Sequence, residues 1–169
     1  MEQAPLILTL AIMPEAQAYF DQLRKQHFPK ERNFLDAHLT LFHHLTLPEQ
    51  ELRETILKGC QRQASFPLQV TGLMPLGRGV AFKIESETLT NLHAQLQQRW
   101  FSSLTAQDQQ KLRPHITVQN KVTPEAANAL LQTLSSDFQP FVTVATGLTL
   151  WRYMNGPWEL LERFDFQGR

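Results

Sequence analysis

Apolar positions along the 169-residue chain follow two periods. Where they recur every second residue, as at Leu6, Leu8 and Leu10, side chains alternate between faces and a strand is expected. Where they recur every three or four residues, as at Phe20 and Leu23, one face of a helix is apolar. The pattern predicts strands near residues 6–12, 38–41, 66–70, 80–84, 115–118, 142–150 and 158–164, and helices near 14–27, 49–60, 89–100 and 124–134.

The order of these expected elements repeats. After the first strand, the series helix, strand, helix, strand, strand occurs twice. No linker, low-complexity segment or block of like charge divides the chain, so residues 1–169 are expected to form one domain made of two duplicated lobes. The fold class that follows is α+β, with two antiparallel sheets flanked by helices in a bilobal arrangement of pseudo-two-fold symmetry.

One short motif stands at the same place in each half: His38-Leu39-Thr40-Leu41 and His115-Ile116-Thr117-Val118. In a strand, the His and Thr of each motif share one face and the apolar residues share the other. If the two strands lie together, two imidazoles and two hydroxyls line a central cleft. A histidine pair can hold one neutral and one protonated ring, which suits acid–base catalysis, while threonine hydroxyls can bind the oxygens of an anion.

Composition restricts the partners and the compartment. Sixteen basic and sixteen acidic residues leave no net charge, which argues against a protein that wraps long DNA or RNA but permits a local phosphate pocket. Cys60 is the only cysteine, so no internal disulfide can form. The apolar stretch 6–12 is too short for a membrane span and lacks the basic flank of a signal peptide. A cytoplasmic protein without membrane association is expected.

The paired motifs resemble those of the two-histidine (2H) phosphoesterase superfamily, whose signature is two His-x-Thr/Ser-x motifs at similar separation. The chain looks most like the branch of 2′-5′ RNA ligases and RNA 2′,3′-cyclic phosphodiesterases, and the likeness runs from the first strand to the last. It implies hydrolysis of a 2′,3′-cyclic phosphate without metal or nucleotide cofactor. It also implies that Thr40 and Thr117 hold the phosphate oxygens, with His38 as acid and His115 as base, although symmetry permits the reverse.

Residues outside the motifs offer further candidates. Arg32, Arg78 and Arg113 lie in loops near the expected cleft, Arg152 lies at a strand end, and each could equally be a solvated surface residue. Phe42 shares the parity of His38 and Thr40, so it could stack on a base or belong to the core. The three tryptophans follow the core periodicity and are not interpreted as a nucleic-acid platform: Trp100, Trp151 and Trp158.

His43 and His44 invite comparison with a metal site. Adjacent strand residues face opposite ways, and a zinc site needs three or four converging ligands. No acidic or cysteine partner is placed nearby in the sequence, so no metal is expected.

Three functions remain open at this point. The first is a metal-independent phosphodiesterase acting on cyclic phosphate ends of RNA or on cyclic nucleotides. The second is a 2′-5′ RNA ligase or hydrolase acting on tRNA halves, and the third is a non-catalytic module that binds RNA or nucleotides. The expected partner in each case is an RNA end or a nucleotide rather than DNA, and a monomer is expected.

Overall fold

The computed structural model describes residues 3–169. Seven strands and four α-helices, with two short 3₁₀ helices, follow one another along this part of the chain: β1 (Leu6–Ile12), α1 (Pro14–His27), η1 (Lys30–Arg32), β2 (Leu39–Leu45), α2 (Glu49–Arg62), β3 (Phe66–Pro75), β4 (Val80–Glu85), α3 (Glu87–Trp100), η2 (Phe101–Ser103), β5 (His115–Gln119), α4 (Pro124–Asp137), β6 (Phe141–Tyr153) and β7 (Trp158–Asp165). Every helix and strand that the hydrophobic pattern predicts is present, so the predicted element order is confirmed.

Local chemistry accounts for where several elements begin. The hydroxyl of Ser86 accepts a hydrogen bond from the backbone of Leu89 at the start of α3, and that of Thr123 caps α4 in the same way. Pro124 occupies the first turn of α4, where its missing N–H has no intrahelical partner to lose. Pro67 lies in the first part of β3, which pairs with β6 alone, because pairing with β4 starts only at Gln69.

All seven strands belong to one antiparallel sheet, so the prediction of two separate sheets is wrong. The strand order is β2-β1-β6-β3-β4-β5, and β7 pairs with β6. The long strand β6 makes the sheet continuous. It pairs with β3 through residues 141–145 and with β7 through residues 147–153 along the same edge, while β1 occupies the other edge.

The strand order has a symmetry of its own. Counted inward from the two ends of the order, β2 corresponds to β5, β1 to β4 and β6 to β3. The hairpin β3–β4 then corresponds to the pair β6–β1, and β7 has no counterpart. The two motif strands are therefore equivalent in topology, as the repeated element order predicts, whereas the duplication of an ancestral half stays a prediction.

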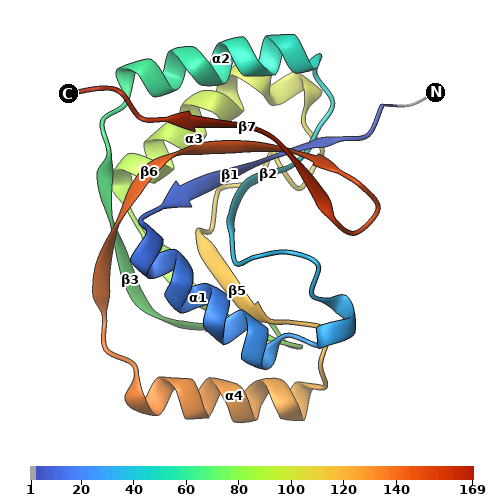
Figure 1. The fold of residues 1–169 in the computed structure, drawn as a ribbon, viewed down its shortest axis with the longest axis vertical. Helices are drawn as coiled ribbons and strands as arrows, with labels where there is room; N and C mark the ends of the chain where they lie inside the picture. The colour runs from blue at the N-terminus through green and yellow to red at the C-terminus, as the bar shows by residue number, and fades with distance from the viewer. Residues whose placement is uncertain (1–2) are drawn as a thin grey trace.

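The sheet curls, so that its two terminal strands meet. β2 and β5 stand at opposite ends of the strand order yet contact each other. Figure 1 shows β1, β2 and β5 crossing the middle of the molecule, with α2 and α3 above them and α4 below. Helix α2 packs on β6 and β7, α4 packs on β3 and β4, and α1 lies along β5. The helices thus cover parts of the sheet, and the curl brings the two strands that carry the motifs into contact.

Within residues 3–169, none of the helices is long and apolar enough to cross a bilayer.

Candidate active site

The two motif histidines are held in the same way. The Nδ1 atom of His38 lies 2.8 Å from the carbonyl oxygen of Asp36, and that of His115 lies 2.6 Å from the carbonyl oxygen of Arg113. Because a carbonyl can only accept, Nδ1 carries the hydrogen in both rings. The Nε2 atom of each neutral ring is then left as a proton acceptor, and each protonated ring gains an Nε2–H donor.

Helix α1 fixes the segment that leads into His38. The amide of Gln17 donates to the carbonyl of Ala37 at 2.8 Å, and the backbone N–H of Ala37 donates to Asp21 at 2.8 Å. Gln17 and Asp21 are four residues apart, so they lie on one face of the helix, and they also bond to each other. This face of α1 therefore sets the backbone position from which the His38 ring projects.

Arg24, one turn further along the same helix, connects the two motif segments. Its side chain is buried and donates through Nε to Asn33 at 2.9 Å and through Nη1 to the carbonyl of Thr117 at 3.1 Å. The guanidinium also lies 4.1 Å from the centre of the Phe28 ring. Burial lowers the pKa of Arg24 to about 10, which leaves it charged at neutral pH. Sequence reasoning missed this residue, because an arginine on a helix is ordinarily interpreted as solvated.

The environment of His38 is desolvated. Burial lowers the pKa of His38 to about 4, although the hydrogen bond to the carbonyl of Asp36 acts in the opposite direction. The charges of Arg24, His43 and His115 lower the pKa further. His38 is therefore neutral at pH 7 in the free protein. The influence of His115 also places the two motif histidines close enough to interact electrostatically.

A cavity of about 860 Å³ opens beside His38, between α1 and the inner face of the sheet. Its wall includes Thr9, Thr149 and Arg163, which lie opposite one another on β1, β6 and β7. Thr40 pairs with Thr9 and continues this row on β2. Thr40 and Thr117 are both partly exposed to solvent.

Two of the three tryptophans lie in this cavity rather than in the core. Trp158 packs against His38 with ring centres 4.7 Å apart, and Trp151 donates from Nε1 to the hydroxyl of Thr9 at 2.9 Å. Both line the cavity and are only partly buried. Trp100 alone is a core residue, as predicted. The expectation for Trp151 and Trp158 is wrong because the face of β6 that carries Trp151 looks into the cavity, not toward the helices.

A β-bulge changes which residues of β2 face the cavity. Thr9 pairs with Thr40 and Leu8 with Phe42, so two steps on β2 oppose one step on β1. Leu41 is the extra residue, and the alternation of faces reverses after it. Phe42 is 0 % exposed and stacks on His93, so its expected orientation toward the cleft is wrong and it belongs to the core.

The four candidate arginines are not brought together. Arg32 is exposed on η1, and Arg78 donates to the carbonyl of Val122 in an exposed turn. Arg113 is exposed and lines a different cavity, next to Lys83 and Glu85. Arg152 is paired with Glu49 and Glu159 on the helix-covered side of the sheet. None of the four arginines lines the cavity beside His38.

Metal-ligating side chains are dispersed in the part of the chain that the structure describes. Among residues 3–169, no three His, Cys, Asp or Glu side chains come together in a way that could hold an ion. Cys60 is a buried thiol on α2, and burial raises its pKa to about 12. The adjacent His43 and His44 both contact Asp108 through their backbone N–H groups.

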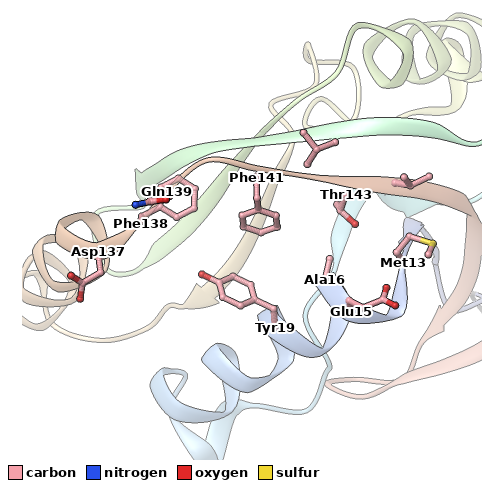
Figure 2. A pocket seen from close by; sticks show the side chains of 11 residues that line it. Met13, Glu15, Ala16, Tyr19, Asp137, Phe138, Gln139, Phe141 and Thr143 are labelled. Carbon is pink, nitrogen blue, oxygen red and sulfur yellow. The ribbon is translucent and has the colours of Figure 1, made fainter.

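A second cavity, of about 560 Å³, lies between the start of α1 and the segment that joins α4 to β6. Figure 2 shows Tyr19 of α1 facing Phe141 across it, with Phe138 beside them. Tyr19 contacts Phe141 edge-on, with 5.4 Å between the ring centres, and Phe138 packs against Phe141 in a tilted arrangement. None of the motif residues lines this cavity, so it is separate from the candidate site.

Comparison with known proteins gives the family. The family model described as "2'-5' RNA ligase superfamily" matches residues 12–157. The chain belongs to this superfamily, the 2H phosphoesterases. No curated protein sequence matches the chain.

Solved structures share the fold over nearly the whole chain. TT0787 of Thermus thermophilus is 20% identical, with a TM-score of 0.68 over 98% of this chain and 99% of that one. E. coli LigT complexed with 3′-AMP is also 20% identical, with a TM-score of 0.63 and the same coverage. LigT complexed with ATP is 21% identical, with a TM-score of 0.64 and again the same coverage. The curled antiparallel half-barrel with its four helices is thus LigT-like.

Proposed function

We propose that this protein is a metal-independent phosphodiesterase that opens 2′,3′-cyclic phosphates at RNA ends or in cyclic nucleotides. The observation that carries the proposal is the matched pair of imidazoles. Each has Nδ1 fixed by the carbonyl two residues earlier and Nε2 free, and the two rings interact electrostatically. A threonine of the same motif accompanies each ring. Membership of the 2H phosphoesterases supports the same chemistry.

In this mechanism Thr40 and Thr117 donate hydrogen bonds to the non-bridging phosphate oxygens. One histidine takes a proton from water through Nε2 as the water attacks phosphorus. The other gives a proton through Nε2–H to the ribose oxygen as its bond to phosphorus breaks. Each proton transfer contributes about 10²–10⁴-fold in rate. One water is consumed, and the product is a ribose phosphate monoester.

The position of the large cavity supports the assignment of His38 as acid and His115 as base. The cavity lies on the His38 side, and its wall contains Trp151 and Trp158, on which a nucleobase can stack. A nucleoside there places the leaving ribose oxygen near His38. Attack in line with the leaving oxygen then brings water from the opposite side, near His115. The nucleotides named in the LigT structures, 3′-AMP and ATP, support a ligand of this class.

The test is hydrolysis of a panel of 2′,3′-cyclic nucleotides and cyclic-ended RNAs, with and without EDTA. His38→Ala and His115→Ala are each expected to lower turnover at least about 10²-fold while the protein stays folded, since each removes one proton transfer. Full activity in EDTA is expected. Loss of activity in EDTA, or turnover that survives both substitutions, would refute the proposal. Binding without turnover by the wild type would favour a non-catalytic binding module instead.

A second candidate is joining or cleavage of 2′-5′ linkages in RNA, because the matching family is described by that ligase activity. Joining would use the same residues in the same roles, with a ribose 5′-hydroxyl in place of water, and cleavage of the 2′-5′ linkage would run the two proton transfers in reverse. Incubation with tRNA halves separates the two candidates. A joined product supports ligation, and its absence at high protein concentration counts against it. For either reaction we expect a monomer acting in the cytoplasm.

A further inference from the structure

Asp108 holds His43 in a fixed orientation at the free edge of β2. The carboxylate lies in the loop between η2 and β5, and its side chain is only 1% exposed. It accepts hydrogen bonds from the backbone N–H groups of His43 and His44, both at 2.9 Å. It also lies 3.2 Å from Nδ1 of the His43 ring. Because an ionised carboxylate only accepts, Nδ1 is the donor and Nε2 is directed away from Asp108.

The charge on Asp108 is maintained by these contacts. Burial alone would raise the pKa of this carboxyl, but its hydrogen bonds with His43 and His44 outweigh burial and lower the pKa. Asp108 is therefore ionised at neutral pH. The His43 side chain covers it and is itself 46% exposed. A ligand meets the imidazole and not the carboxylate.

Beyond the bulge at Leu41 the pairing of β1 with β2 shifts a second time, so that His43 and His44 both lie opposite Ile7, which shares the face of Thr9 on β1. Thr40 pairs with Thr9, and His43 follows Phe42, which pairs with Leu8. His43 thus stands two β1 positions from Thr40, a distance of about 7 Å along the sheet. That distance is comparable to the spacing of successive phosphates along a nucleic acid strand. The charge of His43 also acts on His38, so the ring is near the candidate site.

We propose that His43 binds the phosphate that precedes the reacting cyclic phosphate in an RNA end. In the complex the ring would donate from Nδ1 to Asp108 and from Nε2 to a phosphate oxygen. This inference rests on the proposed function for the location of the reacting phosphate. It makes His43 a residue that distinguishes a cyclic-ended RNA, which has such a second phosphate, from a cyclic mononucleotide, which has none.

The test uses product-like ligands, so it does not depend on turnover. Calorimetry compares a dinucleotide carrying a terminal 2′-phosphate, which has two phosphates, with a nucleoside 2′-monophosphate, which has one. His43→Ala is expected to weaken dinucleotide binding about tenfold more than mononucleotide binding, in line with the loss of one charge-assisted hydrogen bond. His44→Ala is the matched control, because His44 is the exposed neighbour and its backbone bond to Asp108 is retained.

Equal effects of His43→Ala on the two ligands, or equal effects of the two substitutions, would overturn the inference. So would a wild type that binds the two ligands with the same affinity, or that binds neither. The proposed function fails separately. A wild type that binds the dinucleotide through His43 but hydrolyses no cyclic phosphate would refute the enzymatic activity and leave the role of His43 intact.

Discussion

The low proton affinity of His38 predicts that anion binding will draw a proton into the site. Burial lowers the pKa of this ring from 6.5 to about 4, which corresponds to about 3 kcal/mol against the charged form. At pH 7 only about one free molecule in a thousand then carries the proton. An anion bound where we propose, between Thr40 and Thr117, would stabilise the imidazolium, so binding and protonation would favour each other.

Sulfate is a suitable probe, because it remains a dianion from pH 5 to pH 8. If His38 becomes protonated in the complex, the affinity of the wild type for sulfate rises by up to about tenfold for each pH unit from 7 to 5. Calorimetry in two buffers of different ionisation enthalpy counts the protons taken up. His38→Gln is expected to reduce the number of protons taken up on sulfate binding. His115→Gln measures how many of these protons go to His115. Uptake that is unchanged in His38→Gln would refute the reasoning.

The lowered pKa of His38 also affects the stability of the free protein. The unfolded chain binds the His38 proton near pH 6.5, whereas the folded protein binds it only near pH 4. The contribution of His38 to the free energy of unfolding is therefore fully present above pH 6.5. It is lost as the pH falls toward 4, by about 3 kcal/mol in total. Urea unfolding across this range should show a shallower pH dependence in His38→Gln. A His38 NMR signal that titrates near 6.5 in the free protein would contradict both predictions.

Two further predictions concern the buried Arg24 and two glycines. Arg24→Met removes the hydrogen bonds to Asn33 and to the carbonyl of Thr117, and should lower the unfolding free energy by about 2 kcal/mol in urea titrations; wild-type stability would show that Arg24 is dispensable. Gly79→Ala places a Cβ on the Gln119 carbonyl and should cost about 3 kcal/mol, whereas Gly59→Ala, with open space on α2, should stabilise by about 1 kcal/mol. Equal melting temperatures for the two glycine variants would contradict the close approach of Gly79 to the backbone of Gln119.

The elements could be predicted because the core is built on strict periodicity. Leu6, Leu8 and Leu10 are all buried on β1, and Leu52 and Ile56 are buried on α2, one helical turn apart. Burial of such positions requires the local structure whose period they match. The motif residues were found by the same rule, since His and Thr at alternate strand positions share a face. These signals are local, and each can be recognised within about ten residues.

The remaining features depend on contacts between distant segments. An extra residue at Leu41 reverses the faces of β2 and buries Phe42, and a second shift in the pairing places His43 and His44 opposite Ile7. The hydrophobic pattern does not mark the extra residue, because Leu41 and Phe42 are both apolar and both buried. Asp108 lies 65 residues from His43 along the chain. The single continuous sheet likewise depends on β6 pairing with three strands from both halves of the sequence.

The two motifs have the same sequence pattern, and each histidine makes the same hydrogen bond to a backbone carbonyl, but their surroundings differ. His38 has Trp158 against its ring and the charge of Arg24 nearby, and it borders the large cavity. His115 does not line that cavity and pairs across the sheet with Lys83. An anion bound beside His38 raises the pKa of the ring and so brings a proton in, and the imidazolium formed can then give that proton to the leaving ribose oxygen. The depressed pKa of His38 is therefore compatible with the role of acid, provided that substrate binding supplies the proton. The sulfate measurement tests that condition directly.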